Sequence, residues 1–213
     1  MEKLSRRERE KLEREEAIIS KAEELFCKHG FEKVSMADLA KESEYTKRTI
    51  YRYFTCKEDL VFAVALRGYK RLMEMIKNKS QKGNTGLEKI RLSYYAYYEF
   101  LCKFPQMLKL INTGEVLKSG TANSNMPFRQ KYLDYDNYLF RELVQMFIDG
   151  KTDKSIRSDL EMPQLALSSI FTATGFFVML STSGNSYTNH FALDKEAFVT
   201  FTIEMFISSL RQS

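Results

Sequence analysis

The sequence has few residues that interrupt regular secondary structure and few that support catalysis. Its 213 residues include nine glycines and three prolines, which favours long helices over a sheet with many turns. The three cysteines form no C-x-x-C pair, so neither a zinc site nor a disulfide framework is indicated. Only His29 and His190 offer imidazole, and no nucleophile elbow, phosphate loop or metal-spaced cluster accompanies them. We therefore predict a protein that is not an enzyme and that holds no cofactor or metal.

Charge is absent from one long C-terminal stretch. No Asp, Glu, Lys or Arg occurs between Glu161 and Asp194. Polar residues limit the apolar run to 170–180, which is shorter than the ~20 residues of a membrane-spanning helix. We therefore expect a buried or interface helix in this stretch. The N-terminal residues 1–16 alternate in charge without an apolar core, which excludes a secretory signal and, with the unpaired cysteines, predicts a cytoplasmic protein.

The residues that are present predict an all-α protein. Apolar side chains recur at helical spacing, and several positions carry the signals of helix ends. Ser35 with Asp38, and Thr55 with Glu58, have capping-box spacing, and Gly30 suits the end of a helix. The expected helices are 16–28, 35–43, a short one after Thr46, 55–78, 87–104, 105–112, 126–149, 162–182 and 193–211.

Cations and aromatic rings are concentrated in residues 43–60, "SEYTKRTIYRYFTCKEDL". A three-residue break, 44–46, joins two short helices, which is the arrangement of a helix-turn-helix. Ile50 and Tyr53 take the inner side of the second short helix, and the outer side keeps Lys47, Arg48, Tyr51 and Arg52. Arginine pairs with guanine, and lysine and hydroxyl groups contact phosphate. This face therefore predicts binding to double-stranded DNA, although composition alone would equally suit a solvated surface.

Residues 22–60 as a whole resemble the DNA-binding head of the TetR family of bacterial transcriptional regulators. The matching positions are Ala22, Leu25, Phe26, Gly30, Phe31, 36–40, 49–54, Lys57, Glu58 and Leu60. The resemblance implies an N-terminal three-helix DNA-binding domain, 1–60, with 1–15 as an extension, and a C-terminal helical domain, 61–213, for effector binding and dimerisation. The expected DNA-binding residues are Ser35, Thr46, Lys47, Arg48, Thr49, Tyr51, Arg52 and Lys57.

The turn of the predicted motif departs from the family pattern. Ser43, Glu44, Tyr45 and Thr46 stand where the family often has a small residue, glycine, an aliphatic residue and serine. Glutamate at a position that favours positive φ is strained, so we expect a differently bent turn. Arg48 replaces a residue that is usually small. The departures leave the DNA-binding role in place but do not allow an operator sequence to be transferred.

The resemblance also implies a homodimer and a ligand site. One short recognition helix reads few base pairs, so two copies must act together. In the family, the last two long helices form the dimer. The candidate contacts here are Leu165, Ser169, Phe176, Phe177, Leu180, Phe198, Phe201, Met205 and Phe206, with burial inside one subunit as the alternative for each. The candidate ligand-binding residues are Tyr94, Tyr98, Phe104, Tyr135, Tyr138 and Phe171, which would suit an aromatic or lipophilic effector but equally suit an ordinary core.

The function that these patterns predict is a ligand-responsive repressor that acts as a homodimer on a palindromic operator. The alternative is a membrane-surface or small-molecule-binding helical protein without specific DNA binding. Residues 67–82 carry six basic side chains against Glu74, but residues 1–16 offer only Leu4 and Leu12 for insertion into a membrane surface.

Overall fold

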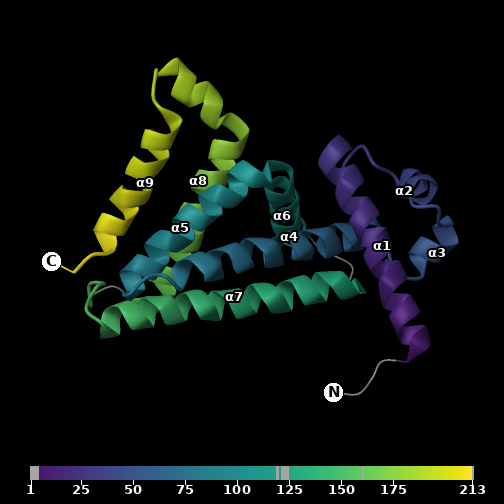
Figure 1. The fold of residues 1–213 in the computed structure, drawn as a ribbon, viewed down its shortest axis with the longest axis horizontal. Coiled ribbons are helices and arrows are strands. Elements are labelled where there is room, and N and C mark those ends of the chain that lie inside the picture. Colours follow the sequence, from purple (N-terminus) through teal and green to yellow (C-terminus); the bar gives the residue numbers. More distant parts are fainter. Residues whose placement is uncertain (1–4, 119, 121–124, 160, 213) are drawn as a thin grey trace. The chain divides into compact units, whose positions relative to one another are not determined.

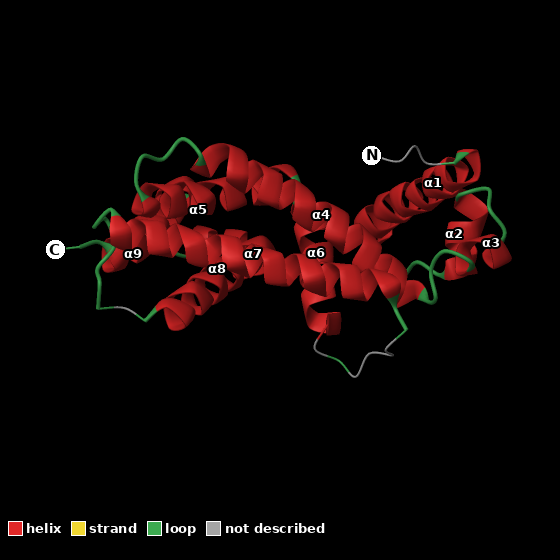
Figure 2. Cartoon of the chain, turned by 90° about the horizontal axis from the view of Figure 1, so that it is seen from below, coloured by secondary structure: helices red, strands yellow, loops and turns green. Residues whose placement is uncertain are grey.

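The computed structural model describes residues 5–118, 120, 125–159 and 161–212, in which helices alternate with short loops and no strand occurs (Figures 1 and 2). An isolated antiparallel bridge joins Ile156 and Arg211. The all-α prediction is confirmed. The helices are α1 (Arg6–His29), α2 (Met36–Glu42), α3 (Lys47–Tyr51), α4 (Lys57–Ser80), α5 (Gly86–Lys103), α6 (Pro105–Lys118), α7 (Pro127–Thr152), α8 (Met162–His190) and α9 (Lys195–Leu210).

Local capping fixes where the N-terminal helices begin. Ser35 and Asp38 form the expected capping box at α2, and the Thr46 side chain accepts a hydrogen bond from the Thr49 amide at α3. The α4 start differs from the prediction, because Thr55 bonds to Asp59 rather than to Glu58. Its amide and hydroxyl lie 3.3 and 3.5 Å from Asp59 Oδ2. Asp59 is buried and Glu58 is exposed, so the side chain that turns inward makes the contact.

Helix α8 continues beyond the expected end at residue 182. The serine and threonine hydroxyls of its C-terminal half bond to carbonyls one turn earlier, as Thr188 does to Gly184 at 3.0 Å. Among the described residues, α8 is the one helix long and apolar enough to cross a membrane by length and composition, and 33% of its most apolar window is buried. Core helices of soluble proteins meet the same criteria.

The chain divides into two compact units. The first comprises residues up to Tyr69 together with Lys109–Tyr135, and the second comprises Lys70–Leu108 together with the residues from Asp136 onward. In the first unit a segment of the central chain packs with the N-terminal helices, and the expected functional boundary at residue 60 stays a prediction. Residues 1–4 of the expected N-terminal extension lie outside the described part, and the rest of the extension is continuous with α1.

Each unit has its own aromatic and aliphatic core. In the first unit the fully buried side chains include Ile18, Leu39, Ile50, Phe54, Phe62 and Tyr132. In the second unit α5 packs against both α8 and α9, and the buried side chains include Phe100, Phe147, Phe177 and Ile203. Burial of rings of this size is the main source of stability for such units.

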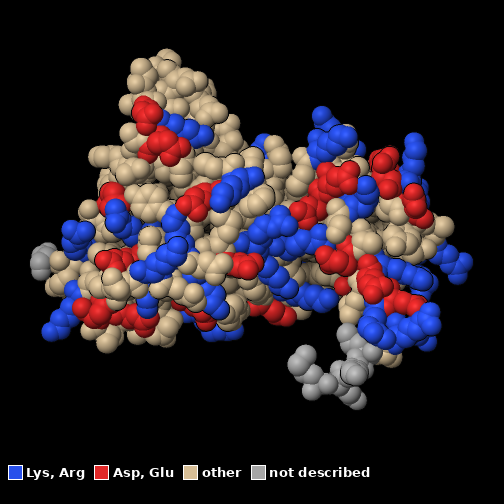
Figure 3. Space-filling view, viewed as in Figure 1, with Lys and Arg blue, Asp and Glu red and all other residues tan. Residues whose placement is uncertain are grey.

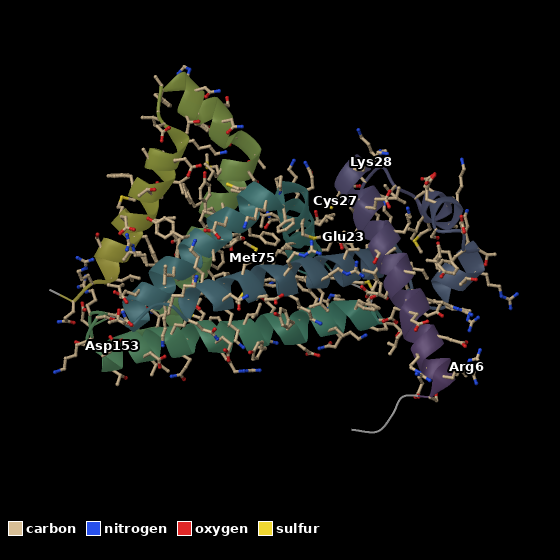
Figure 4. The ribbon with its side chains drawn as sticks, in the orientation of Figure 1. Arg6, Glu23, Cys27, Lys28, Met75 and Asp153 are labelled. Atoms are coloured by element: carbon tan, nitrogen blue, oxygen red, sulfur yellow. The ribbon has the colours of Figure 1, made fainter. Side chains whose placement is uncertain are left out.

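The beginning of α5 is held by residues that follow α7. Asp153, labelled in Figure 4, accepts a hydrogen bond from the Gly86 amide at 2.7 Å, and Ser155 Oγ accepts one from the Leu87 amide at 3.1 Å. These bonds satisfy amides that a helix start leaves without intrahelical partners. They require α5 and α7 to approach closely at Gly86 and Gly150.

Candidate nucleic-acid interface

The turn between α2 and α3 has the geometry that a helix-turn-helix needs. Glu44 adopts φ 60°, the left-handed conformation that favours glycine, so the turn retains this conformation despite the glutamate. Thr46 then caps α3 in extended conformation. The Ser35 hydroxyl and amide donate to Asp38 at 2.6 and 2.9 Å and lower the pKa of that carboxyl group. The hydroxyls of Ser35 and Thr46 are therefore occupied by helix caps.

Helix α3 is buried on one side and charged on the other. Ile50 has 0% exposure and packs inward, while Lys47, Arg48, Tyr51 and Arg52 are exposed. Within the described part of the chain, the three cations take part in no hydrogen bond or ion pair, so their charges face solvent. Tyr53, expected on the inner side, is half-buried, and Thr49 is also half-buried. The exposed face is thus available to a polyanion, as the sequence predicts.

Lys57 has partners within the protein. Its Nζ lies 4.2 Å from the centre of the Phe31 ring and 3.4 Å from the Glu32 carbonyl oxygen. A cation in the first turn of a helix is unfavourable for the helix dipole. The contacts with Phe31 and Glu32 offset this, so a phosphate partner is not needed to explain Lys57. Its role in DNA binding stays a prediction.

An ion-pair network fastens α1 to α4 and so supports the motif. Arg67 Nη1 lies 3.0 Å from Glu23, which is labelled on α1 in Figure 4, and Arg67 Nη2 lies 2.7 Å from Glu16. The Ser20 hydroxyl accepts a further bond from Arg67 at 3.1 Å. Figure 3 shows Lys and Arg side chains beside α3 and, mixed with acidic ones, at the N-terminal end of α1. Lys and Arg side chains also cover other parts of this face, so the exposed cations of α3, rather than a net charge of the head, carry the DNA-binding prediction.

The candidate ligand-binding residues fall into separate groups. Tyr94 and Tyr98 are buried in the second unit, where both rings pack near Phe177, with centroids 6.4 and 6.3 Å away. The Tyr94 hydroxyl donates to the Ser169 carbonyl at 3.0 Å, and burial raises its pKa. Phe104, of the same unit, is half-buried, whereas Tyr138 and Phe171 are exposed. Tyr135 belongs to the first unit, in a ring contact with Tyr69.

The candidate dimer contacts also divide by exposure. Leu165, Ser169, Phe177 and Leu180 are buried within the protomer, where Ser169 bonds to Tyr94 and Phe177 lies among the α5 tyrosines. Phe176, Phe198 and Phe206 are half-buried. Phe201 and Met205 are exposed on α9, with 67% and 59% of their surface accessible. Helical spacing alone identifies an apolar stripe but does not say which side faces the same subunit.

Sequence reasoning missed two groups of residues. Leu167 and Met179 are exposed on α8 together with Phe171, and their spacing of four and eight residues could have indicated one face. Asp59 is buried and bonds to the Phe128 amide at 2.9 Å. That contact joins positions 69 residues apart in the chain, so no local signal could have revealed it.

Comparison with known proteins agrees with this geometry. The sequence model described as "Bacterial regulatory proteins, tetR family" matches residues 18–64. The chain is 26% identical over 147 residues to an HTH-type transcriptional regulator of Staphylococcus aureus, covering 69% of this chain and 78% of that protein. It is 28% identical over 131 residues to the S. aureus regulator QacR, covering 59% and 68%.

The fold is also that of solved regulators. The structure of AibR in complex with isovaleryl coenzyme A and operator DNA superimposes with a TM-score of 0.66 at 19% identity, covering 90% of this chain and 97% of AibR. One assignment follows from the helix-turn-helix with its exposed cations, from the matched segment and from these relatives. Residues 18–64 are therefore identified with the tetR family of bacterial regulatory proteins, and the chain is similar to DNA-binding transcriptional regulators.

Proposed function

We propose that the protein is a cytoplasmic homodimer that binds a palindromic operator, represses transcription there and is released when a small molecule binds its second unit. The observation that carries the operator contact is the face of α3, where Lys47, Arg48 and Arg52 are exposed while Ile50 anchors the helix from behind. Unpaired cations on an anchored helix suit phosphates and base edges of the major groove. This favours DNA binding over the membrane-surface alternative.

The dimer is supported by the exposed apolar side chains of α8 and α9. Leu167, Phe171 and Met179 follow one another at multiples of four residues on α8, and Phe201 and Met205 do so on α9. Large apolar faces of this kind are covered by a partner in stable proteins. We place the interface on these exposed residues rather than on the buried candidates such as Phe177.

The side chains of the second unit favour an aromatic or lipophilic effector. The rings of Tyr94, Tyr97 and Tyr98 surround Phe177, with the Tyr97 centroid 4.7 Å from that of Phe177. The hydroxyls of Tyr94 and Tyr98 are already bonded to Ser169 and Glu196. The tyrosines therefore offer ring faces rather than free hydrogen-bonding groups, which suits apolar contact.

Selection of fragments from random duplex DNA tests the operator proposal. We expect the purified wild-type protein to enrich a palindromic sequence, because two symmetry-related heads read two half-sites. Binding to that sequence should weaken linearly with the logarithm of salt concentration as phosphate contacts release counterions. Enrichment of no common sequence, or of one without two-fold symmetry, would contradict the proposal.

Replacing Arg48 should affect specificity, whereas replacing Lys57 should affect affinity alone. We expect Arg48→Ala to lower operator affinity by roughly ten- to a hundredfold and to relax the base preference at one position. We expect Lys57→Ala to weaken binding to all DNA sequences alike and to reduce the salt slope by about one, because it removes one phosphate contact. Fluorescence anisotropy with operator variants measures both effects. Lys77→Ala, an exposed cation of the second unit, is the matched control, and an Arg48→Ala protein with unchanged base preference would remove Arg48 from base readout.

A further inference from the structure

The residues that follow the recognition helix are joined to the first turn of α7. Phe54 and Asp59 lie on either side of the α4 start, and both contact Phe128, the second residue of α7. All of these residues belong to the first compact unit. The contact therefore connects the DNA-binding motif to a helix that begins about 70 residues later in the chain.

Asp59 is the polar centre of this junction. Its side chain has 0% exposure, and its two oxygens bond in two directions. Oδ1 accepts from the Phe128 amide at 2.9 Å, and Oδ2 accepts from the Thr55 amide and hydroxyl at 3.3 and 3.5 Å. A buried carboxylate is costly unless hydrogen bonds compensate for the lost water, so the bonds that Asp59 accepts offset the cost of its burial.

The bonds connect the starts of two helices. The Phe128 amide lies in the first turn of α7 and has no partner inside its own helix. The Thr55 amide immediately precedes α4. Because both helix starts carry partial positive charge, one carboxylate between them stabilises both. Asp59 thereby holds the start of α7 against the start of α4, with no basic side chain among its hydrogen-bond partners in the described chain.

Contacts between side chains fix the relative orientation of the α4 and α7 starts at this junction. The rings of Phe54 and Phe128 stack with centroids 5.2 Å apart and planes at 29°. Cys56 Sγ lies 3.5 Å from Met126 Sδ, and Lys131 Nζ lies 4.2 Å from the Phe128 ring centre. Phe54 is separated from the end of α3 by only two residues. A displacement of Phe54 or Thr55 would therefore also displace α3.

We propose that Asp59 is a positioning residue for DNA recognition: by joining α7 to the α3–α4 connection it holds α3 in the orientation that reads the operator. The proposal rests on the operator-binding function proposed above. It predicts that breaking the junction lowers specific binding while the cations of α3 stay exposed and continue to bind DNA of any sequence. Loss of specificity with retained non-specific binding is a result that mere loss of stability would not produce.

The test compares Asp59→Asn with Glu58→Gln, using the duplex that the wild-type protein enriches and a random-sequence duplex of equal length. Both variants remove one negative charge from adjacent positions of α4, but Glu58 is exposed and forms no hydrogen bond or ion pair with α7 among the described residues. Removal of an acid near phosphate should by itself leave DNA binding unchanged or strengthen it. The sign of the effect therefore separates positioning from electrostatics.

We expect Asp59→Asn to weaken binding to the enriched duplex about tenfold or more, because an asparagine cannot accept bonds on both sides and the fraction of correctly oriented α3 falls. Binding to the random duplex should be unchanged, and Glu58→Gln should match the wild type on both. Circular dichroism melting verifies that each variant is folded at the assay temperature. A folded Asp59→Asn protein with the specificity of Glu58→Gln would overturn the proposal.

A second variant covers the case in which Asp59→Asn does not fold. Phe128→Leu keeps the α7 amide and most of the buried volume but removes the ring that stacks on Phe54. We expect it to lower the specific affinity several-fold while binding to the random duplex stays unchanged, because it disrupts the same junction. An unchanged specific affinity in Phe128→Leu would also overturn the proposal. If the wild type and Glu58→Gln enrich no sequence, the operator function fails and this inference fails with it.

Discussion

Replacing Phe201 with glutamate is expected to convert the dimer into monomers and to lower operator affinity by at least about a hundredfold. Phe201 is 67% exposed in the protomer, so the substitution leaves the protomer core intact. In the dimer proposed here the new carboxylate would be buried against apolar side chains of the partner, which is strongly unfavourable without a compensating charge. Operator affinity falls because a dimer gains avidity from two heads on one duplex.

Size-exclusion chromatography with light scattering measures this change, together with anisotropy on the operator. Ile148→Glu is the control, since it places the same charge on an exposed apolar position of α7 in the same unit. The control should remain dimeric and bind as the wild type does. A Phe201→Glu protein that stays dimeric at micromolar concentration would place the interface elsewhere.

The DNA-binding motif could be predicted because its signals are local. Ser35 with Asp38 forms the expected capping box, and Thr46 caps α3 as expected. The inward direction of Ile50 follows from helical spacing alone and is observed. Such features depend on residues three or four positions apart, and these remain neighbours whatever the rest of the chain does.

Features that depend on distant contacts could not be predicted in the same way. The sequence favours Glu58 as the partner of Thr55, but Asp59 takes that place because the Phe128 amide approaches from α7. The polar segment after residue 180 suggests a loop, yet α8 continues through it, with its hydroxyls bonded to carbonyls of the same helix as Thr188 is to Gly184. At the start of α4, tertiary packing therefore overrides a local preference.

The proposed dimer face shows the same limit. An apolar stripe along α8 and α9 is evident from the sequence. On α8, however, Phe177 is fully buried while Phe171 is 74% exposed. The two positions differ by six residues, which places them on different sides of α8. Only the positions of the α5 tyrosines, which pack around Phe177, decide between burial and exposure.

Replacing Gly86 with alanine is expected to destabilise the protein by roughly 3 kcal/mol and to lower its melting temperature by about 10 °C. A Cβ at Gly86 would lie 2.2 Å from the Gly150 nitrogen and 2.7 Å from the Met146 carbonyl oxygen. These are backbone atoms of α7, so no side-chain rotation relieves the overlap. The start of α5 must move away from α7, which also stretches the bond from the Gly86 amide to Asp153.

Differential scanning calorimetry on the purified protein measures the effect, with Gly120→Ala as the matched control. Among the described residues, a Cβ at Gly120 would meet only the Leu117 carbonyl oxygen, at 3.5 Å, so that substitution should change the melting temperature by no more than about 2 °C. The difference between the two variants isolates the steric requirement at the α5–α7 crossing. If Gly86→Ala has the same melting temperature as Gly120→Ala, the close approach of α5 and α7 does not constrain the folded protein. If the destabilisation is observed, the second unit depends on a backbone contact that no larger residue can replace.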